Sequence, residues 1–250
     1  MKKNLVGSFF STGIRAGNGI QAHPVDDPPA KRLRLYDIEN CPHCRLVREV
    51  LTELNIDVEI YPCPKGGERY LPKVIELGGK AQRPYLYDPN TDSGRYESLE
   101  IIAYLYDMYA KRRLPIKWRA GSLQAFGSSL ASLPGGGYIK TRRAGRVPRK
   151  KLELYSFESS PYSRLVREEL CELEIPYILR QCGRSNTAEW LPPLLREQLG
   201  IGTCSILHNR QYLLEHTGRM AVPYLYDPNT ETGLYESADI IDYLRNHYDQ

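Results

Sequence analysis

A segment of this chain occurs twice, and this repeat constrains the fold more than any other feature of the sequence. Leu33 to Glu49 reads LRLYDIENCPHCRLVRE, and Leu152 to Glu168 reads LELYSFESSPYSRLVRE. Both copies end on PYLYDPNT followed by YES. In a chain of 250 residues, two such copies predict two related domains of about a hundred residues each. Their chemistry should differ, because Cys-Pro-His-Cys in the first copy is Ser-Pro-Tyr-Ser in the second.

The composition is typical of a soluble globular protein, with 41% hydrophobic and 26% charged residues. No apolar run approaches the roughly 20 residues that cross a bilayer. Glycines and serines interrupt Met1 to Ile20, so we expect no export signal there. A similar pattern at Ser122 to Gly137 suggests that both segments are structural lead-ins to a domain. The six cysteines include one close pair, unlike a disulfide-stapled secreted domain, which favours the reducing cytoplasm.

The connection between the copies is strongly basic. Lys111 to Lys151 contains twelve lysines and arginines and no acidic residue, although the net charge of the chain is only +4. Glycines and prolines predict little regular structure there beyond a short helix around Leu123 to Leu133. The basic residues could contact an acidic partner, anionic lipid or nucleic acid. Alternatively, the segment is a solvated connector, or its arginines pair with the acidic domains. Nucleic acid is disfavoured, because no base-stacking aromatic platform accompanies the charge.

Hydrophobic spacing predicts the same order of elements in each copy. In the first, alternation predicts strands over 32–36 and 56–61, and helical spacing predicts helices after Cys41-Pro42 and over 68–77. The first two strands should pair in parallel. A hairpin over 85–87 and 94–97 should follow, and Ser98 can cap a last helix. The apolar face of that last helix is expected to contain Ile101, Ile102, Leu105 and Met108.

This β-α-β-α-β-β-α order, with Cys-Pro-x-Cys at the first helix, resembles the thioredoxin fold. The pairs Glu97-Ser98 and Glu236-Ser237 make glutaredoxins and the N-terminal domain of glutathione transferases the closer match. The whole chain resembles bacterial and plastid proteins that join two such domains. The resemblance implies an α/β fold without the all-helical domain of ordinary glutathione transferases. Its expected parts are a lead-in (1–30), a first domain (31–110), a basic linker (111–149) and a second domain (150–250) with an insertion near 199–216.

Cys41 is the candidate nucleophile. At the start of a helix its sulfur would face unpaired amides and the positive end of the helix dipole, which lower a cysteine pKa. Arg45 and Arg48 add positive charge one turn later. Cys44 is near enough to resolve a mixed disulfide. His43 between them is similar to a Cys-Pro-His-Cys oxidase motif, which implies a more oxidising disulfide.

Other interpretations of the cysteines remain open. A structural zinc site lacks a second ligand pair at suitable spacing, and a shared iron-sulfur cluster, known in some glutaredoxins, is a further alternative. Two inert buried thiols are disfavoured, because we expect the helix start to expose at least the sulfur of Cys41. Cys63 and Cys182 are equivalent positions that packing explains best, whereas Cys171 and Cys204 have no partner pattern.

The resemblance further implies a glutathione site in each copy. Arg83-Pro84 and Val222-Pro223 would be cis, so that the backbone of Arg83 or Val222 pairs with the cysteinyl part of glutathione. In Glu97-Ser98 and Glu236-Ser237, the serine would receive the γ-glutamyl carboxylate and the glutamate would face its ammonium group. Helix capping is a compatible alternative for both serines.

The leading hypothesis is a glutathione-dependent thiol-disulfide oxidoreductase that resembles glutaredoxin and is active through the first domain. Ser160 cannot exchange disulfides, but it could donate a hydrogen bond to a glutathione thiolate, as the matching serine does in some transferases. Alternatively, the second domain is a degenerate copy kept for packing or partner binding. Two further hypotheses are a transferase-like enzyme for small electrophiles and a non-catalytic glutathione- or protein-binding module. The basic linker at 111–151 would dock such a module to an acidic partner.

Overall fold

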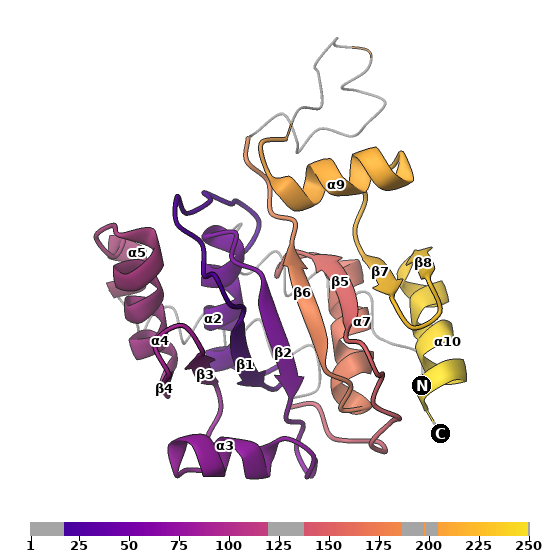
Figure 1. Ribbon diagram of the computed structural model, residues 1–250, viewed down its shortest axis with the longest axis horizontal. Coiled ribbons are helices and arrows are strands. Elements are labelled where there is room, and N and C mark those ends of the chain that lie inside the picture. The colour runs from indigo at the N-terminus through magenta and orange to yellow at the C-terminus, as the bar shows by residue number, and fades with distance from the viewer. Residues whose placement is uncertain (1–17, 120–137, 187–197, 199–204, 250) are drawn as a thin grey trace.

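The computed structural model describes residues 18–119, 138–186, 198 and 205–249, which form two halves with the same order of elements (Figure 1). The first half contains β1 (Leu33–Asp37), α2 (Pro42–Glu53), β2 (Val58–Pro62), α3 (Leu71–Gly78), β3 (Tyr85–Asp88), β4 (Ser93–Arg95) and α4 (Ser98–Leu105), followed by a π-helical turn (Tyr106–Ala110) and α5 (Ile116–Arg119). The second half contains β5 (Leu152–Ser156), α7 (Pro161–Glu172), β6 (Tyr177–Gln181), α9 (His208–Thr217), β7 (Tyr224–Asp227), β8 (Thr232–Tyr235) and α10 (Ser237–Tyr248). The predicted β-α-β-α-β-β-α order is confirmed in both halves.

The two halves share one continuous sheet of eight strands in the order β4-β3-β1-β2-β6-β5-β7-β8. β1 and β2 pair in parallel, as predicted, and so do β5 and β6. The halves join where β2 and β6 pair antiparallel, with Glu59 opposite Ile178. These two residues occupy equivalent positions in the two copies. Glu59 follows Val58, which pairs with the first residue of β1, and Ile178 follows Tyr177, which pairs with the first residue of β5. An approximate two-fold axis therefore passes between Glu59 and Ile178.

The helices follow the same symmetry. α2 packs against α4, and α7 packs against α10. In Figure 1 α3 and α9 lie at opposite ends of the view, and α4 and α10 lie toward its two sides. Buried apolar residues of both halves, including Leu35, Val47, Leu154 and Val166, belong to one contiguous cluster. The repeat therefore produces one body with one main core.

The repeated Tyr-Asp-Pro-Asn-Thr motif anchors the last helix of each half. Asp88 accepts a hydrogen bond from the backbone N–H of Asn90 (2.7 Å), as in an Asx turn, and it also accepts one from the hydroxyl of Tyr104 (2.6 Å). Asp227 makes the equivalent bonds to Asn229 (2.7 Å) and Tyr243 (2.7 Å). The motif that predicts a hairpin turn thus also ties that turn to the helix that follows.

The apolar face predicted for the last helix of the first half is wrong at one position. Met108 is 38% exposed, because α4 ends at Leu105 and the wider π-helical turn rotates Met108 away from the core. Tyr106 and Tyr109 are buried there instead.

The start of α3 and the position of the insertion in the second half also differ from those predicted. α3 begins at Leu71 rather than at residue 68, because Pro72 suits the first turn of a helix and leaves Tyr70 as the N-cap. The extra residues of the second half were expected near 199–216, but α9 occupies part of that range and takes the place of α3. Both helices end on a left-handed glycine, Gly79 or Gly218, so the insertion precedes α9. The helix expected around Leu123 to Leu133 lies outside the described residues.

A buried ionic network joins α2 and α7 across the two-fold axis. Arg48 on α2 donates to Glu158 of the second half (Nε to Oε2, 2.8 Å), and it also contacts Glu39 of its own half (3.2 Å). Arg167, the equivalent residue on α7, lies 3.3 Å from both Glu39 and Glu158. Arg48 also donates to Asp37. Both arginines have side chains no more than 1% exposed, so each half completes the charge balance of the other.

The segment before each half crosses over to the other half. Residues 18–22, which we call the N-terminal arm, pair with Arg184: the backbone N–H of Ala22 donates to its carbonyl oxygen (2.9 Å). Residues 138–141, which we call the linker arm, pair with Lys65, whose N–H donates to the carbonyl oxygen of Ile139 (2.8 Å). The arms form equivalent parallel bridges. The described ends of the two expected lead-ins thus occupy equivalent places, each on the half that it does not precede.

Several basic residues of the connection form ion pairs with the two halves. Lys117 lies 2.9 Å from Glu53, Arg142 lies 2.8 Å from Glu169, and Lys151 lies 3.3 Å from Glu59. These contacts favour the interpretation of the connection as a structural linker whose charge is balanced by acidic residues of the protein itself.

The ionic network makes a prediction about stability. Arg48→Ala should lower the free energy of unfolding by about 3–5 kcal/mol, because it leaves buried carboxylates without their partner. Urea denaturation followed by circular dichroism measures this change. Lys73→Ala is the matched control: its partner Glu76 is 65% exposed, and an exposed pair contributes less than about 1 kcal/mol. Equal losses in both variants would contradict the structural role of the network.

Candidate functional site

Cys41 is the N-cap residue of α2, directly after β1 and a short turn. Its backbone is extended (φ −80°, ψ 124°), and Pro42 follows at the first helical position, where a missing N–H costs nothing. The sulfur accepts a hydrogen bond from the backbone N–H of Cys44 at 3.5 Å. The sequence folds this way because a proline at the helix start and an acceptor side chain before it both favour an N-terminus. The sulfur therefore faces the free amides of the helix.

This position makes Cys41 acidic for a thiol. A hydrogen bond from the Cys44 thiol lowers the pKa of Cys41, and this effect is larger than the rise in pKa that burial causes. Hydrogen bonds from the backbone amides of Cys44 and His43 and the charge of Arg48 lower the pKa further, to about 7. Burial and the neighbouring Cys41 raise the pKa of Cys44 well above its usual value. At neutral pH Cys41 is thus partly thiolate, while Cys44 stays a thiol and acts as the hydrogen-bond donor.

The expectation that the helix start exposes Cys41 is wrong. The residue is only 4% exposed, and it belongs to a buried cluster with Ile38, Cys44 and Cys171, against which Ile139 of the linker arm packs. The cover comes from the linker arm, since the backbone N–H of Ile139 donates to the carbonyl oxygen of Glu39 (3.4 Å), two residues before Cys41. Cys171, which had no partner in the sequence, is contributed to this cluster by α7 of the other half.

The two arginines expected beside Cys41 act mainly elsewhere. Arg48 lowers the pKa of Cys41, but its guanidinium is held by the ionic network described above. Arg45 is 4% exposed and lies 3.8 Å from Glu158. Most of the stabilisation of the thiolate therefore comes from hydrogen bonds at the helix start.

Cis peptide bonds precede Pro84 and Pro223, as the resemblance implied. Both prolines are buried and stand directly before β3 or β7, while Arg83 and Val222 are partly exposed. The backbone before each third strand is therefore turned in the same way in both halves.

The Glu-Ser pairs begin the last helices, with the glutamate rather than the serine in the N-cap position. Glu97 and Glu236 have φ of 57° and 63°, a left-handed region that non-glycine residues seldom adopt, and neither side chain makes a cap hydrogen bond. Such strain at equivalent positions of both halves suggests function rather than packing. Both glutamates are exposed, and Glu97 accepts from Gln82 whereas Glu236 accepts from Arg219 (2.9 Å).

Among the predicted site residues of the first half, the structure brings the start of α4 into contact with the start of α2. The hydroxyl of Ser98, which is 4% exposed, lies 3.5 Å from Nδ1 of His43, so the start of α4 adjoins the start of α2. Ser98 is the first residue of its helix and does not cap it, because the turn at Glu97 takes the N-cap position. In the second half, Ser237 begins α10 in the same way.

Ser160 is the N-cap of α7 and takes the place of Cys41. It is 3% exposed, and its hydroxyl oxygen accepts from the backbone N–H (3.3 Å) and the hydroxyl (2.8 Å) of Ser163. The second half therefore keeps the helix-start geometry of the first with oxygen in place of sulfur.

The remaining described cysteines pack, as predicted. Cys63 belongs to a buried cluster with Tyr36, Val74 and Tyr85, and Cys182 belongs to the equivalent cluster of the second half. Burial raises the pKa of both thiols. Cys204 lies outside the described residues. In the part of the chain that the structure describes, no group of three histidine, cysteine or acidic side chains is arranged to hold a metal ion, and no helix is long and apolar enough to cross a membrane.

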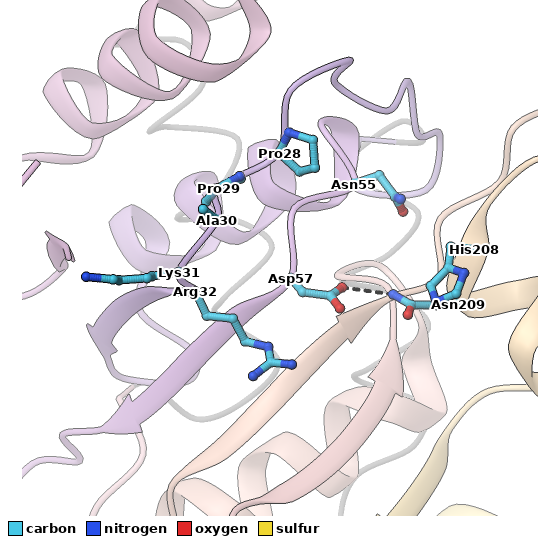
Figure 2. Close-up of a pocket in the computed structure, with 9 residues that line it drawn as sticks. All are labelled: Pro28, Pro29, Ala30, Lys31, Arg32, Asn55, Asp57, His208 and Asn209. Atoms are coloured by element: carbon cyan, nitrogen blue, oxygen red, sulfur yellow. Dashed lines mark hydrogen bonds between the residues drawn. The ribbon is translucent and has the colours of Figure 1, made fainter. Parts of the chain in front are cut away.

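A cavity of about 570 Å³ lies away from these residues, between the segment before β1 and the start of α9 (Figure 2). Asp57 on one side of it accepts a hydrogen bond from Asn209 on the other (2.8 Å), as the close-up shows. Asp57 also lies 2.9 Å from Arg180. These contacts tie α9 to the centre of the sheet, which gives this region a structural role.

The pKa of Cys41 can be tested by its rate of alkylation. Iodoacetamide should modify Cys41 with a pH midpoint of about 7, because only the thiolate reacts. Cys44→Ala should raise that midpoint, since it removes the largest stabilising contact, whereas Cys63→Ala should leave it unchanged. Mass spectrometry of the peptide identifies the modified residue. A wild-type midpoint near the ordinary value of about 8.5 would contradict the geometry.

The family model for the glutathione S-transferase N-terminal domain matches residues 35–113 and 154–250. No curated protein and no solved structure gives a significant match to the chain. The two matched segments contain both helix starts, both cis prolines and both Glu-Ser pairs.

Proposed function

Since this chain belongs, in both of its halves, to the family of glutathione S-transferase N-terminal domains, we propose that it is a glutathione-dependent thiol-disulfide oxidoreductase active through the first half. The observation that carries the proposal is Cys41, a thiol with a pKa lowered to about 7 at the start of α2, beside a second thiol on the same helix. Only the first half has this pair, because serines replace both cysteines in the second. The reducing cytoplasm is the compartment that suits such chemistry.

The reaction proceeds by two thiol exchanges. The Cys41 thiolate attacks the glutathione sulfur of a disulfide that carries glutathione, forms a mixed disulfide with glutathione, and releases the sulfur of the substrate as a thiolate. A second glutathione thiolate then attacks the glutathione sulfur of the mixed disulfide, which forms oxidised glutathione and returns Cys41 to the thiolate. Cys44 can instead attack the Cys41 sulfur. Its complete burial and raised pKa favour the route through glutathione.

Glutathione would be held by groups that the first half places around the helix start. The backbone of Arg83, before the cis proline, offers hydrogen bonds for an extended peptide, and the strained turn at Glu97 presents the start of α4 to a carboxylate. The exposed Glu97 side chain suits an ammonium group. The second half repeats the cis proline and the strained glutamate, so we propose that it either binds glutathione through Ser160 and Ser237 or serves as a structural partner.

Activity assays on cysteine variants test the proposed reaction. In glutathione-coupled reduction of a small mixed disulfide, Cys41→Ser should lose at least about a hundredfold in rate, because a serine hydroxyl cannot exchange disulfides. Cys44→Ser should retain most of the activity, as expected for the glutathione route. Cys182→Ser is the control, since that thiol is buried in the other half. Equal rates in all variants would exclude the proposal, and activity only toward an electrophile would favour a transferase.

Calorimetric titration with reduced glutathione tests which half binds it. If only the first half binds, the wild type should bind one molecule. Ser98→Ala should then weaken binding about ten- to a hundredfold through the loss of one hydrogen bond to a charged group, and Ser237→Ala should have no effect. Two binding events, one sensitive to each serine, would show that the second half has kept its site. Binding unaffected by either variant would contradict the role proposed for the Glu-Ser pairs.

A further inference from the structure

The N-terminal arm packs tightly against the second half. Its residues Gly19, Ile20 and Ala22 are all buried. A Cβ atom on Gly19 would lie 2.9 Å from Cβ of Glu158. One on Gly183 would lie 2.6 Å from Cβ of Ala22, so the arm and the second half approach each other with no room for further side-chain atoms. This arm is therefore a fixed part of the packing around the serines of the second half.

The linker arm, which covers Cys41, lies less deeply. All four of its residues are at least partly exposed. It is joined to the first half by the N–H of Lys65, which donates to Ile139 (2.8 Å), by the N–H of Thr141, which donates back to Lys65 (3.0 Å), and by the packing of Ile139 on the cluster that contains Cys41. Segments with few buried contacts and exposed backbone hydrogen bonds open at a low cost in free energy. Of the two arms, the linker arm is thus the one that can open more easily.

The end of the linker arm is fastened to the second half by polar contacts. The hydroxyl of Thr141 donates to Glu174 (3.2 Å). Arg142, directly after the arm, lies 2.8 Å from Glu169 on α7 and 2.8 Å from Asp249 after α10. Its side chain is 38% exposed, so these ion pairs can break and re-form without disturbing the core. The second half therefore holds the segment that covers the thiol of the first.

The N-terminal arm has no such anchor. Ala22 and His23 occupy the positions of Thr141 and Arg142, and His23 forms no ion pair with the part of the chain that the structure describes. A polar anchor thus accompanies the arm over the thiol, whereas close packing fixes the arm over the serines.

We propose that the linker arm is a strap that controls access to Cys41 and is held closed by Thr141 and Arg142. Because Cys41 is only 4% exposed, a disulfide cannot reach its sulfur until Ile139 moves away. This movement breaks the two backbone hydrogen bonds to Lys65 and leaves the sheet intact. The second half thereby regulates the first through the linker. The inference goes beyond the function proposed above, since a closed arm would slow any reagent that attacks Cys41.

Alkylation of Cys41 by iodoacetamide at about pH 9 tests access alone, because a thiol with a pKa of about 7 is fully ionised there. The wild type should react far more slowly than the thiolate of free glutathione. Arg142→Gln should react about two- to tenfold faster than the wild type, as expected for the loss of a partly exposed ion pair. Arg143→Gln is the matched control, since Arg143 is exposed and forms no ion pair with the described residues. Equal rates in the two variants would overturn the anchor, and a wild-type rate equal to that of glutathione would overturn the strap.

Hydrogen exchange distinguishes opening of the arm from a general loss of stability. In Arg142→Gln the N–H groups of Lys65 and Thr141 should exchange faster by the same factor as alkylation, because one opening event exposes both. The N–H of Arg184, which donates to the N-terminal arm (2.7 Å), should exchange as in the wild type. Thr141→Val, which loses only the hydrogen bond to Glu174, is a milder second variant and should act in the same direction. Faster alkylation without faster exchange at Lys65, or faster exchange at Arg184 as well, would overturn the proposal.

Turnover separates this inference from the proposed function. In glutathione-coupled disulfide reduction, Arg142→Gln should raise kcat/KM by a factor similar to that for alkylation, because opening precedes thiol exchange. An unchanged kcat/KM in a variant that is alkylated faster would overturn the role of the arm in turnover. If the wild type itself lacks activity, the proposed function fails, while alkylation and hydrogen exchange still decide whether the linker arm controls access to Cys41.

Discussion

The buried arginine and glutamate pairs on the two-fold axis are the constraint on which the arrangement of the halves depends. The side chains of Arg48 and Arg167 are fully buried on their helices, and their charge is costly to bury unless carboxylates are in place. Those carboxylates, Glu39 and Glu158, come from the turns before both helices. Burial would raise the pKa of Glu39, but Arg48 and Arg167 hold it at about 2. Neither half has a satisfied charge balance without the other.

This constraint also connects the interface to the thiol. Asp37, Glu39 and Cys41 lie on one short stretch of chain, and Arg48 touches the first two while lowering the pKa of the third. Burial raises the pKa of Asp37 to about 6 in spite of Arg48. A change in the packing of the two halves would therefore alter the field around the sulfur. The second half can influence the reaction of the first even if it binds no glutathione.

Local patterns in the sequence predicted most of the elements, because apolar spacing and turn residues act over a few positions. The helix start at Cys41-Pro42 followed from the proline and from the apolar spacing after it, and the helix predicted over 68–77 ends within one residue of α3. The pairing of β2 with β6 had no such signal, since it joins two strands more than a hundred positions apart. Arg48 looked like a free positive charge beside the thiol, because nothing in its own helix reveals its partner in the other copy.

The burial of Cys41 was missed for the same reason. Its cover is a segment about a hundred positions away, and only the equivalent spacing of Gly19-Ile20 and Tyr138-Ile139 before their copies could have pointed to it. The crossed arms have a consequence for how such a chain could arise. A single copy with its arm would bury the same surfaces as a homodimer with exchanged arms. Fusion of two identical genes would then preserve every contact and free one copy to lose its sulfurs, while the other kept its thiols under the isoleucine of the linker arm.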